Sequence, residues 1–214
     1  MSDLLARQLH QGLELLGITT ENGAEVQLLR YIELLNKWNH TYNLTAIRAL
    51  PDMVTKHLLD SCAIIPFLEG CHILDVGTGA GLPGIPIAIL QPQCRVVLLD
   101  SNGKKTRFLK EVQRQLKITN ITIVNERVEN YHAQPSFDTV VSRAFSDLQH
   151  LIMCTKHLLS ARGTWLAMKG LFPQSELTAI SDGYEVQTHV YQVPALNENR
   201  CAVIIRQKQS GSME

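Results

Sequence analysis

Alternating glycines after a short apolar run are the feature that most limits how this chain can fold. Gly77, Gly79 and Gly81 follow the apolar run 73–76 directly, and Gly84 stands where a helix is expected to begin. Each glycine removes a Cβ that would keep a ligand from the backbone, and each permits the positive φ of a tight turn. In doubly wound α/β folds such a turn lies at the carboxyl ends of parallel strands, where ligands bind. The sequence therefore predicts such a fold, with a ligand at this turn.

Short β-rich runs alternate with helical stretches from residue 71 onward, which is typical of a parallel sheet. Strands are expected at 73–76, 96–100, 121–125, 137–142 and 163–168, and helices near 85–90, 104–116, 148–159 and 174–180. Two further strand-like runs, 185–193 and 200–206, are joined by 194–199 without a helix, which predicts an antiparallel pair. We therefore expect a doubly wound α/β fold with a mostly parallel seven-stranded sheet and an antiparallel C-terminal hairpin.

The first part of the chain has a different pattern, because its apolar residues recur at helical spacing from position 3 to position 68. Breaks fall at 17–23 and at 50–52, where Pro51 can begin a new helix. We expect an N-terminal helical region at 1–70, packed on the core of a domain formed by 71–207. A frayed tail is expected at 208–214.

Charge and apolar patterning exclude several classes of protein. The chain has 20 Lys and Arg and 20 Asp and Glu, so a nucleic acid would have to be held by a local patch. No apolar run approaches the roughly 18 to 20 residues that cross a bilayer, and the first residues show no secretory pattern. The five cysteines show no zinc-site spacing. We expect a cytoplasmic protein with no membrane partner and no metal.

The glycine turn fits two classes of cofactor in overlapping frames. Gly79-x-Gly81-x-x-Gly84 is the dinucleotide fingerprint, and Asp75-x-Gly77-x-Gly79-x-Gly81 is the form found at S-adenosylmethionine sites. The glycines alone do not separate the two classes, so the residues around them decide.

Three features favour S-adenosylmethionine. Asp75 can order the turn or meet the positively charged methionine end of that cofactor, whereas it would repel a pyrophosphate. Pro83 and Pro86 remove backbone donors from the turn that would cradle a phosphate. The expected terminal hairpin is typical of methyltransferase sheets. We interpret the chain as an S-adenosylmethionine-dependent methyltransferase, with two alternatives: an NAD(P)-dependent oxidoreductase, and a non-catalytic RNA-binding module on the same fold.

Asp100 ends the second expected strand, where a carboxylate can accept hydrogen bonds from both hydroxyls of a ribose. The alternative is that Asp100 caps the helix that begins near Gly103. Its place after the glycine turn favours the ribose. From the residues alone, Gly77, Gly79 and Asp100 are therefore predicted to bind the cofactor.

Segments from nearly the whole chain resemble, in order, one known family. They are Lys37-Trp38-Asn39, Tyr42-Asn43-Leu44-Thr45, His57-Leu58-Leu59-Asp60-Ser61, 75–86, Leu98-Leu99-Asp100-Ser101, Arg107-Phe108-Leu109, Ser142-Arg143-Ala144-Phe145 and Lys169-Gly170. The family is the small-subunit ribosomal RNA guanine-N-7 methyltransferase G, also called glucose-inhibited division protein B. The resemblance implies methylation of N-7 of a guanine in 16S ribosomal RNA, near the decoding centre. It also implies that the cofactor is contacted by Gly77, Leu82, Val128, Glu129 and Arg143.

Guanine N-7 carries no proton, so the reaction needs no general base and no catalytic acid or base is assigned. Arg143 is expected to hold the cofactor carboxylate or to donate to guanine O-6. Phe145 is expected either to stack on the base or to pack in the core. The alternative for Arg143 is an ion pair with an acid such as Glu129.

Basic residues near the same sheet edge are candidates for RNA contact. Lys104 and Lys105 begin an expected helix that also carries Arg107, Lys110, Arg114 and Lys117, opposed only by Glu111. Such a face can meet RNA phosphates or simply be solvated. Lys169, after the fifth expected strand, is the better single candidate. His57 is expected either to be a hydrogen-bonded helix residue, which is the favoured role, or to line the site. The expected partner is 16S ribosomal RNA or the small ribosomal subunit, and the expected oligomeric state is a monomer.

Overall fold

The computed structural model describes residues 3–21, 23–143, 145 and 147–208. The strands are β1 (His72–Val76), β2 (Arg95–Leu99), β3 (Ile121–Val124), β4 (Phe137–Ser142), β5 (Leu159–Lys169), β6 (Tyr184–Gln192) and β7 (Asn199–Gln207). The helices before the sheet are α1 (Asp3–Leu15), α2 (Ala24–Tyr42), α3 (Leu50–Met53), the π-helical η1 (Val54–Leu59), α4 (Asp60–Cys62) and η2 (Ile65–Phe67). The others are α5 (Gly84–Leu90), α6 (Gly103–Leu116), α7 (Leu148–Thr155) and α8 (Gln174–Thr178). Within the described residues, no helix has the length and apolar character that a membrane crossing requires.

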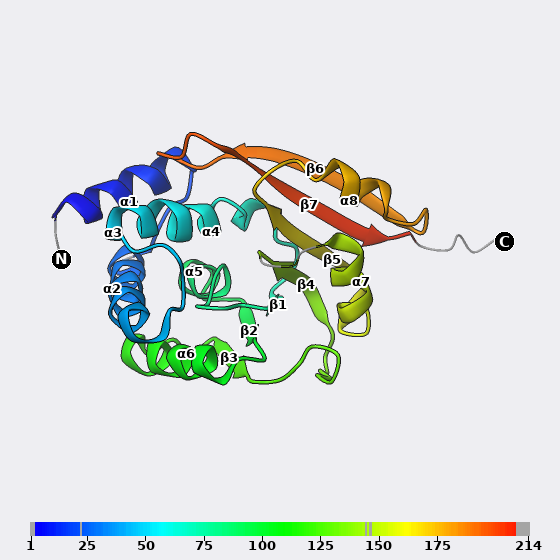
Figure 1. Cartoon of the computed structure of the whole chain (residues 1–214), viewed down its shortest axis with the longest axis horizontal. Helices are drawn as coiled ribbons and strands as arrows, with labels where there is room; N and C mark the ends of the chain where they lie inside the picture. Colours follow the sequence, from blue (N-terminus) through cyan, green and yellow to red (C-terminus); the bar gives the residue numbers. More distant parts are fainter. Residues whose placement is uncertain (1–2, 22, 144, 146, 209–214) are drawn as a thin grey trace.

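One sheet organises the molecule (Figure 1). Its seven strands, counted over the described residues, lie in the order β3-β2-β1-β4-β5-β7-β6. The first five strands are parallel, whereas β7 is antiparallel to both β5 and β6. The strand order reverses between β1 and β4, and ligands of open α/β sheets bind outside the carboxyl ends of the strands at such a point. The predicted fold class is confirmed, including the antiparallel C-terminal hairpin.

Alternate residues of the central strands face two hydrophobic clusters. Ile73 and Leu98 belong to the cluster shared with α2, α5 and α6. Leu74 and Leu99 belong to the cluster shared with α7. Successive side chains of a strand point to opposite faces, so a strand that is apolar at every position needs cover on both sides. The helices of Figure 1 provide this cover, and their packing fixes the position of the strand ends.

The N-terminal helices hold the glycine turn from one side. The hydroxyl of buried Tyr31 in α2 donates to the backbone oxygen of Ala80 at 2.8 Å. The ring of Trp38 packs against Phe108 of α6, with centroids 5.6 Å apart. Side chains of α1, α2 and η1 share one core cluster with the sheet, and the division into domains at residue 70 stays a prediction. Of the expected frayed tail, positions 209–214 lie outside the described residues.

Two neighbouring boundaries differ from the expected ones by four residues each. The helix expected at 148–159 ends at Thr155, and β5 begins at Leu159 instead of 163. The backbone N–H of Phe137 donates to the oxygen of Leu158 at 2.8 Å, and Leu159 pairs with Phe137 in the sheet. Two consecutive leucines fit either a helical or a strand pattern. Pairing with β4 therefore decides their conformation.

Candidate functional site

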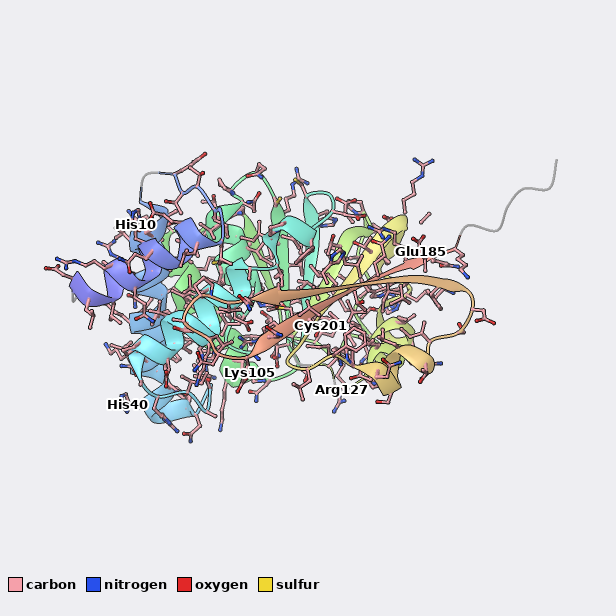
Figure 2. The ribbon with its side chains drawn as sticks, turned by 90° about the horizontal axis from the view of Figure 1, so that it is seen from above. His10, His40, Lys105, Arg127, Glu185 and Cys201 are labelled. Atoms are coloured by element: carbon pink, nitrogen blue, oxygen red, sulfur yellow. The ribbon has the colours of Figure 1, made fainter. Side chains whose placement is uncertain are left out.

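A cavity of about 310 Å³ opens at the carboxyl ends of β1 and β2. Segments far apart in the sequence line it: Val76, Gly77, Leu99, Asp100, Ser101, Lys105, Glu126, Arg127, Val128, Glu129 and Phe145. Figure 2 shows Lys105 and Arg127 near one edge of the molecule, with His10 near another. We call the cavity of about 310 Å³ the first cavity. It brings together Gly77, Asp100, Val128 and Glu129, all of which the sequence analysis assigned to a cofactor.

The glycines of the turn divide into two kinds. A Cβ at Gly77 would meet no atom within 4 Å, and a Cβ at Gly79 would meet only the oxygen of Gly77, at 3.9 Å. Both have positive φ, 66° and 63°. A Cβ at Gly84 would instead lie 2.2 Å from Cδ2 of Leu98, so this glycine is needed for packing between helix and strand. The turn therefore leaves bare backbone at Gly77 and Gly79, as a ligand in close contact requires.

Asp75 orders the glycine turn through hydrogen bonds to its buried carboxyl group. Its Oδ2 accepts hydrogen bonds from the hydroxyl of Thr78 at 2.6 Å and from the backbone N–H of Gly84 at 2.8 Å. Burial raises the pKa of the Asp75 carboxyl to about 6, although both hydrogen bonds act in the opposite direction. Of the two roles expected for Asp75, the structure shows the first, because the side chain is fully buried under the turn.

The raised pKa of Asp75 predicts a pH-dependent stability. Burial disfavours the charged form. The contribution of the protonated Asp75 carboxyl to the free energy of unfolding is therefore fully present below its unfolded pKa of 3.8 and is lost as pH rises through about 6. An asparagine side chain at this position would stay neutral at every pH. Between pH 4 and pH 7, the Asp75→Asn variant should therefore gain stability relative to the parent, by as much as about 3 kcal/mol. Urea unfolding of both proteins across this range measures the difference, and a difference that stays constant with pH contradicts the prediction.

Asp100 joins the glycine turn to the next helix. Its Oδ2 accepts from the N–H of Gly79 at 2.9 Å, and its Oδ1 accepts from the N–H of Asn102 at 2.8 Å. Nζ of Lys105 lies 3.4 Å from Oδ2. The N-cap of α6 is Asn102, whose side chain accepts from the N–H of Lys104. The alternative role of Asp100 as the helix cap is therefore wrong, and its carboxylate lies at the cavity.

The loop that joins β3 to β4 forms the far wall of the first cavity. All of its residues are described and none is helical, and Val128 and Glu129 line the cavity from it. Glu126, Arg127 and Ser101 line the same cavity and were not singled out from the sequence. All three follow the carboxyl end of a parallel strand, and this position is the signal that could have identified them.

Leu82 and Arg143 do not line the first cavity. Leu82 is 3% exposed and belongs to the core cluster, so a contact with a cofactor would have to use its backbone. Arg143 follows β4, and its Nη1 lies 3.9 Å from Oδ2 of Asp60, the first residue of α4. Over the part of the chain that the structure describes, Arg143 forms no ion pair with Glu129, the partner that the sequence suggested. The cofactor roles of Leu82 and Arg143 stay predictions.

A second cavity, of about 530 Å³, lies on the Arg143 side of the same sheet edge. Its lining comes from five stretches of the chain: Thr45, Ala46, Ile47, Lys56, His57, Asp60, Arg143, Met168, Lys169, Gly170, Glu198 and Arg200. Nε2 of His57 is 2.9 Å from the hydroxyl of Thr45. Burial, together with the nearby charge of Arg143, lowers the pKa of His57 to about 4. His57 is thus a hydrogen-bonded helix residue that also lines this cavity, so both of its expected roles are met, and it is neutral near pH 7.

The three lysines assigned to RNA lie in different surroundings. Lys104 is exposed at the start of α6, whereas Lys105 reaches the first cavity beside Asp100. Lys169 ends β5 on the second cavity, where its Nζ contacts Glu176 at 2.6 Å and the backbone oxygen of Phe145 at 3.2 Å. Lys104 is therefore free to meet a polyanion on the surface, and Lys169 is already paired. Their contact with RNA stays a prediction.

The strand order, the reversed last strand and the bare glycine turn define the class I methyltransferase fold. Two solved structures share it. A SAM-dependent methyltransferase from Aquifex aeolicus has a TM-score of 0.56 and 17% identity, and the match covers 72% of this chain and 93% of that chain. The precorrin-6y C5,15-methyltransferase of Geobacter metallireducens has a TM-score of 0.55 and 15% identity, and the match covers 78% of this chain and 93% of that chain. At these identities the likeness shows the fold alone.

Sequence comparison gives the family. The model of the family described as rRNA small subunit methyltransferase G matches residues 24–204. The protein named ribosomal RNA small subunit methyltransferase G in Legionella pneumophila strain Philadelphia 1 is 58% identical over 178 residues, which are 83% of this chain and 85% of that protein. The protein of the same name in Nitrosococcus oceani is 48% identical over 204 residues, 95% of each chain. The chain belongs to the rRNA small subunit methyltransferase G family, which supports the methyltransferase interpretation over the oxidoreductase.

Proposed function

We propose that this chain transfers a methyl group from S-adenosylmethionine to N-7 of a guanine in 16S ribosomal RNA of the small subunit, near the decoding centre. The observation that carries the proposal is the bare backbone of Gly77 and Gly79 beside the carboxylate of Asp100. Family membership supports the choice of reaction and of RNA. We propose that the protein acts in the cytoplasm as a monomer.

The first cavity fits S-adenosylmethionine. A Cβ at Gly77 would fill part of it, so the native turn leaves room for a ligand against the backbone. Asp100 would accept hydrogen bonds from the ribose hydroxyls, while Val128 and Glu129 would contact the adenine. The sulfonium of the bound cofactor supplies the electrophilic methyl group.

The residues of the chain need only bind and orient the acceptor. Guanine N-7 has a lone pair and no proton, so no side chain has to remove one. Arg143, which follows β4, would donate a hydrogen bond to guanine O-6, and this bond would aim N-7 at the first cavity. Phe145 lines that cavity, and its ring would shield the reacting atoms from water.

The reaction is tested with small ribosomal subunits from a strain that lacks this methylation. After incubation with the protein and S-adenosylmethionine, borohydride reduction and aniline treatment cleave RNA only at N-7-methylguanine. We expect one new break in 16S ribosomal RNA, at a position near the decoding centre. Subunits that already carry the modification are the matched control, and they should show no added break. Absence of a break with free RNA and with subunits at several stages of assembly refutes the proposal and favours the RNA-binding module.

A further inference from the structure

A buried carboxylate in the second cavity connects three parts of the chain. The side chain of Asp60, in α4, is 8% exposed. Nη1 of Arg143, after β4, lies 3.9 Å from its Oδ2, and Nε of Arg200, on β7, lies 3.4 Å from its Oδ1. A buried carboxylate without cations beside it is strongly destabilising. Asp60 and the two arginines therefore form one charged unit, which holds both guanidinium groups at the cavity.

The arginines keep donors for a further anion. Arg143 uses Nη1 toward Lys56 and His57, and Arg200 uses Nη1 toward Glu198. Among the described residues, none accepts a hydrogen bond from Nη2 of either arginine. Lys56 adds another positive charge to the lining. Asp60 and Glu198 balance the charges of the two guanidinium groups, so Lys56 gives this part of the lining its excess positive charge. Guanidinium forks suit phosphate oxygens and the acceptor edge of a guanine.

The second cavity lies beside the place where the methyl group would be offered. Asp75 of β1 pairs with Val141 of β4, and the hydroxyl of Ser142 donates to the backbone oxygen of Val76 at 3.1 Å. Gly77 and Arg143 therefore leave neighbouring strands at the same level. One belongs to the first cavity and the other to the second. An acceptor in the second cavity would thus lie next to a cofactor in the first.

We propose that the second cavity receives the acceptor guanosine of the RNA, and that Asp60 is a positioning residue that holds Arg143 and Arg200 against this nucleotide. The proposal rests on the proposed function. It gives the N-terminal helices a part in the reaction, because α4 supplies the carboxylate that the ends of β4 and β7 share. Asp60 touches the arginines and not the reacting atoms.

Replacement of Asp60 by Asn tests the proposal. The variant keeps the shape of the side chain but loses the charge that aligns both guanidinium groups. With unmethylated small subunits as substrate, we expect the KM for the subunit to rise at least tenfold. The Kd for S-adenosylmethionine, measured by calorimetry, should stay within twofold of the parent value. In Asp60→Glu, which keeps the charge, the KM should lie between the parent value and that of Asp60→Asn. An unchanged KM, or an equal loss of cofactor affinity, overturns the proposal.

Glu69→Gln is the matched control. Glu69 pairs with Arg206 on the same strand β7, but away from either cavity, so this variant removes a more exposed ion pair to that strand without touching the site. Its KM should equal that of the parent, and an equal rise in both variants overturns the positioning role. If Asp60→Asn does not fold, Arg200→Gln applies the same test, because Arg143 still neutralises Asp60.

A binding measurement separates this proposal from the proposed function. Retention of 16S ribosomal RNA on filters needs no methyl transfer. Weaker retention by Asp60→Asn than by the parent supports the acceptor cavity even if neither protein methylates the RNA. Equal retention, together with equal KM, overturns the cavity assignment and leaves the methyltransferase proposal standing.

Discussion

Replacing Asp100 with Asn is expected to weaken the binding of S-adenosylmethionine about a hundredfold. In the parent, one carboxylate oxygen accepts from the N–H of Gly79 and the other from the N–H of Asn102. An amide would place its NH₂ against one of these donors and would lose an acceptor for the ribose. Hydrogen bonds to a charged group contribute about 1.5–3 kcal/mol each, and about 2.8 kcal/mol corresponds to a hundredfold change in Kd. Calorimetric titration with the cofactor measures the change.

Asp147→Asn is the control for the Asp100 variant. Asp147 also accepts backbone hydrogen bonds at the start of a helix, from Gln149 and His150, but it does not line the first cavity. Its replacement should leave the Kd for the cofactor within twofold of the parent value. A similar loss of affinity in both variants would mean that the backbone hydrogen bonds that order a loop, and not ribose binding, explain the effect at Asp100.

Local patterns predicted most of the fold. Alternating strand and helix runs between 73 and 142 were found because β1 and β2 carry apolar residues on both faces and each strand is bounded by polar or turn residues. The end of α7 was not found, because Leu158 and Leu159 fit either period and are fixed by pairing with Phe137 of β4. A partner that lies more than twenty positions away leaves no trace in the local pattern.

The two cavities differ in how much the sequence revealed. Gly77 and Asp100 were found because each follows a parallel strand, and the ends of neighbouring strands must meet. The pairing of Arg143 with Asp60 was not found, because an ion pair between distant segments depends on how helices and strands pack. One signal was present: Asp60 is the only acidic residue in the apolar stretch 58–65, and a lone carboxylate there needs a buried partner.

Gly84→Ala should be strongly destabilising. The added Cβ would lie 2.2 Å from Cδ2 of Leu98 and 2.7 Å from Oδ2 of Asp75. Neither neighbour can move freely, because Leu98 is fully buried in β2 and Asp75 is held by Thr78 and by Gly84 itself. Overpacking of this kind costs about 2–3 kcal/mol, which lowers the Tm of a chain of this size by roughly 5–10 °C. Thermal and urea unfolding measure the loss.

Gly77→Ala should have the opposite profile, because its Cβ would meet no protein atom within 4 Å and would point into the space of the first cavity. The positive φ of 66° at this position costs an alanine only about 1–2 kcal/mol, so the Tm should fall by less than in Gly84→Ala. The affinity for S-adenosylmethionine should fall at least tenfold, since the methyl group occupies the surface that the cofactor needs. Parental affinity in Gly77→Ala would show that this bare backbone does not contact the cofactor, and the glycine at this position would then serve only the positive φ of the turn.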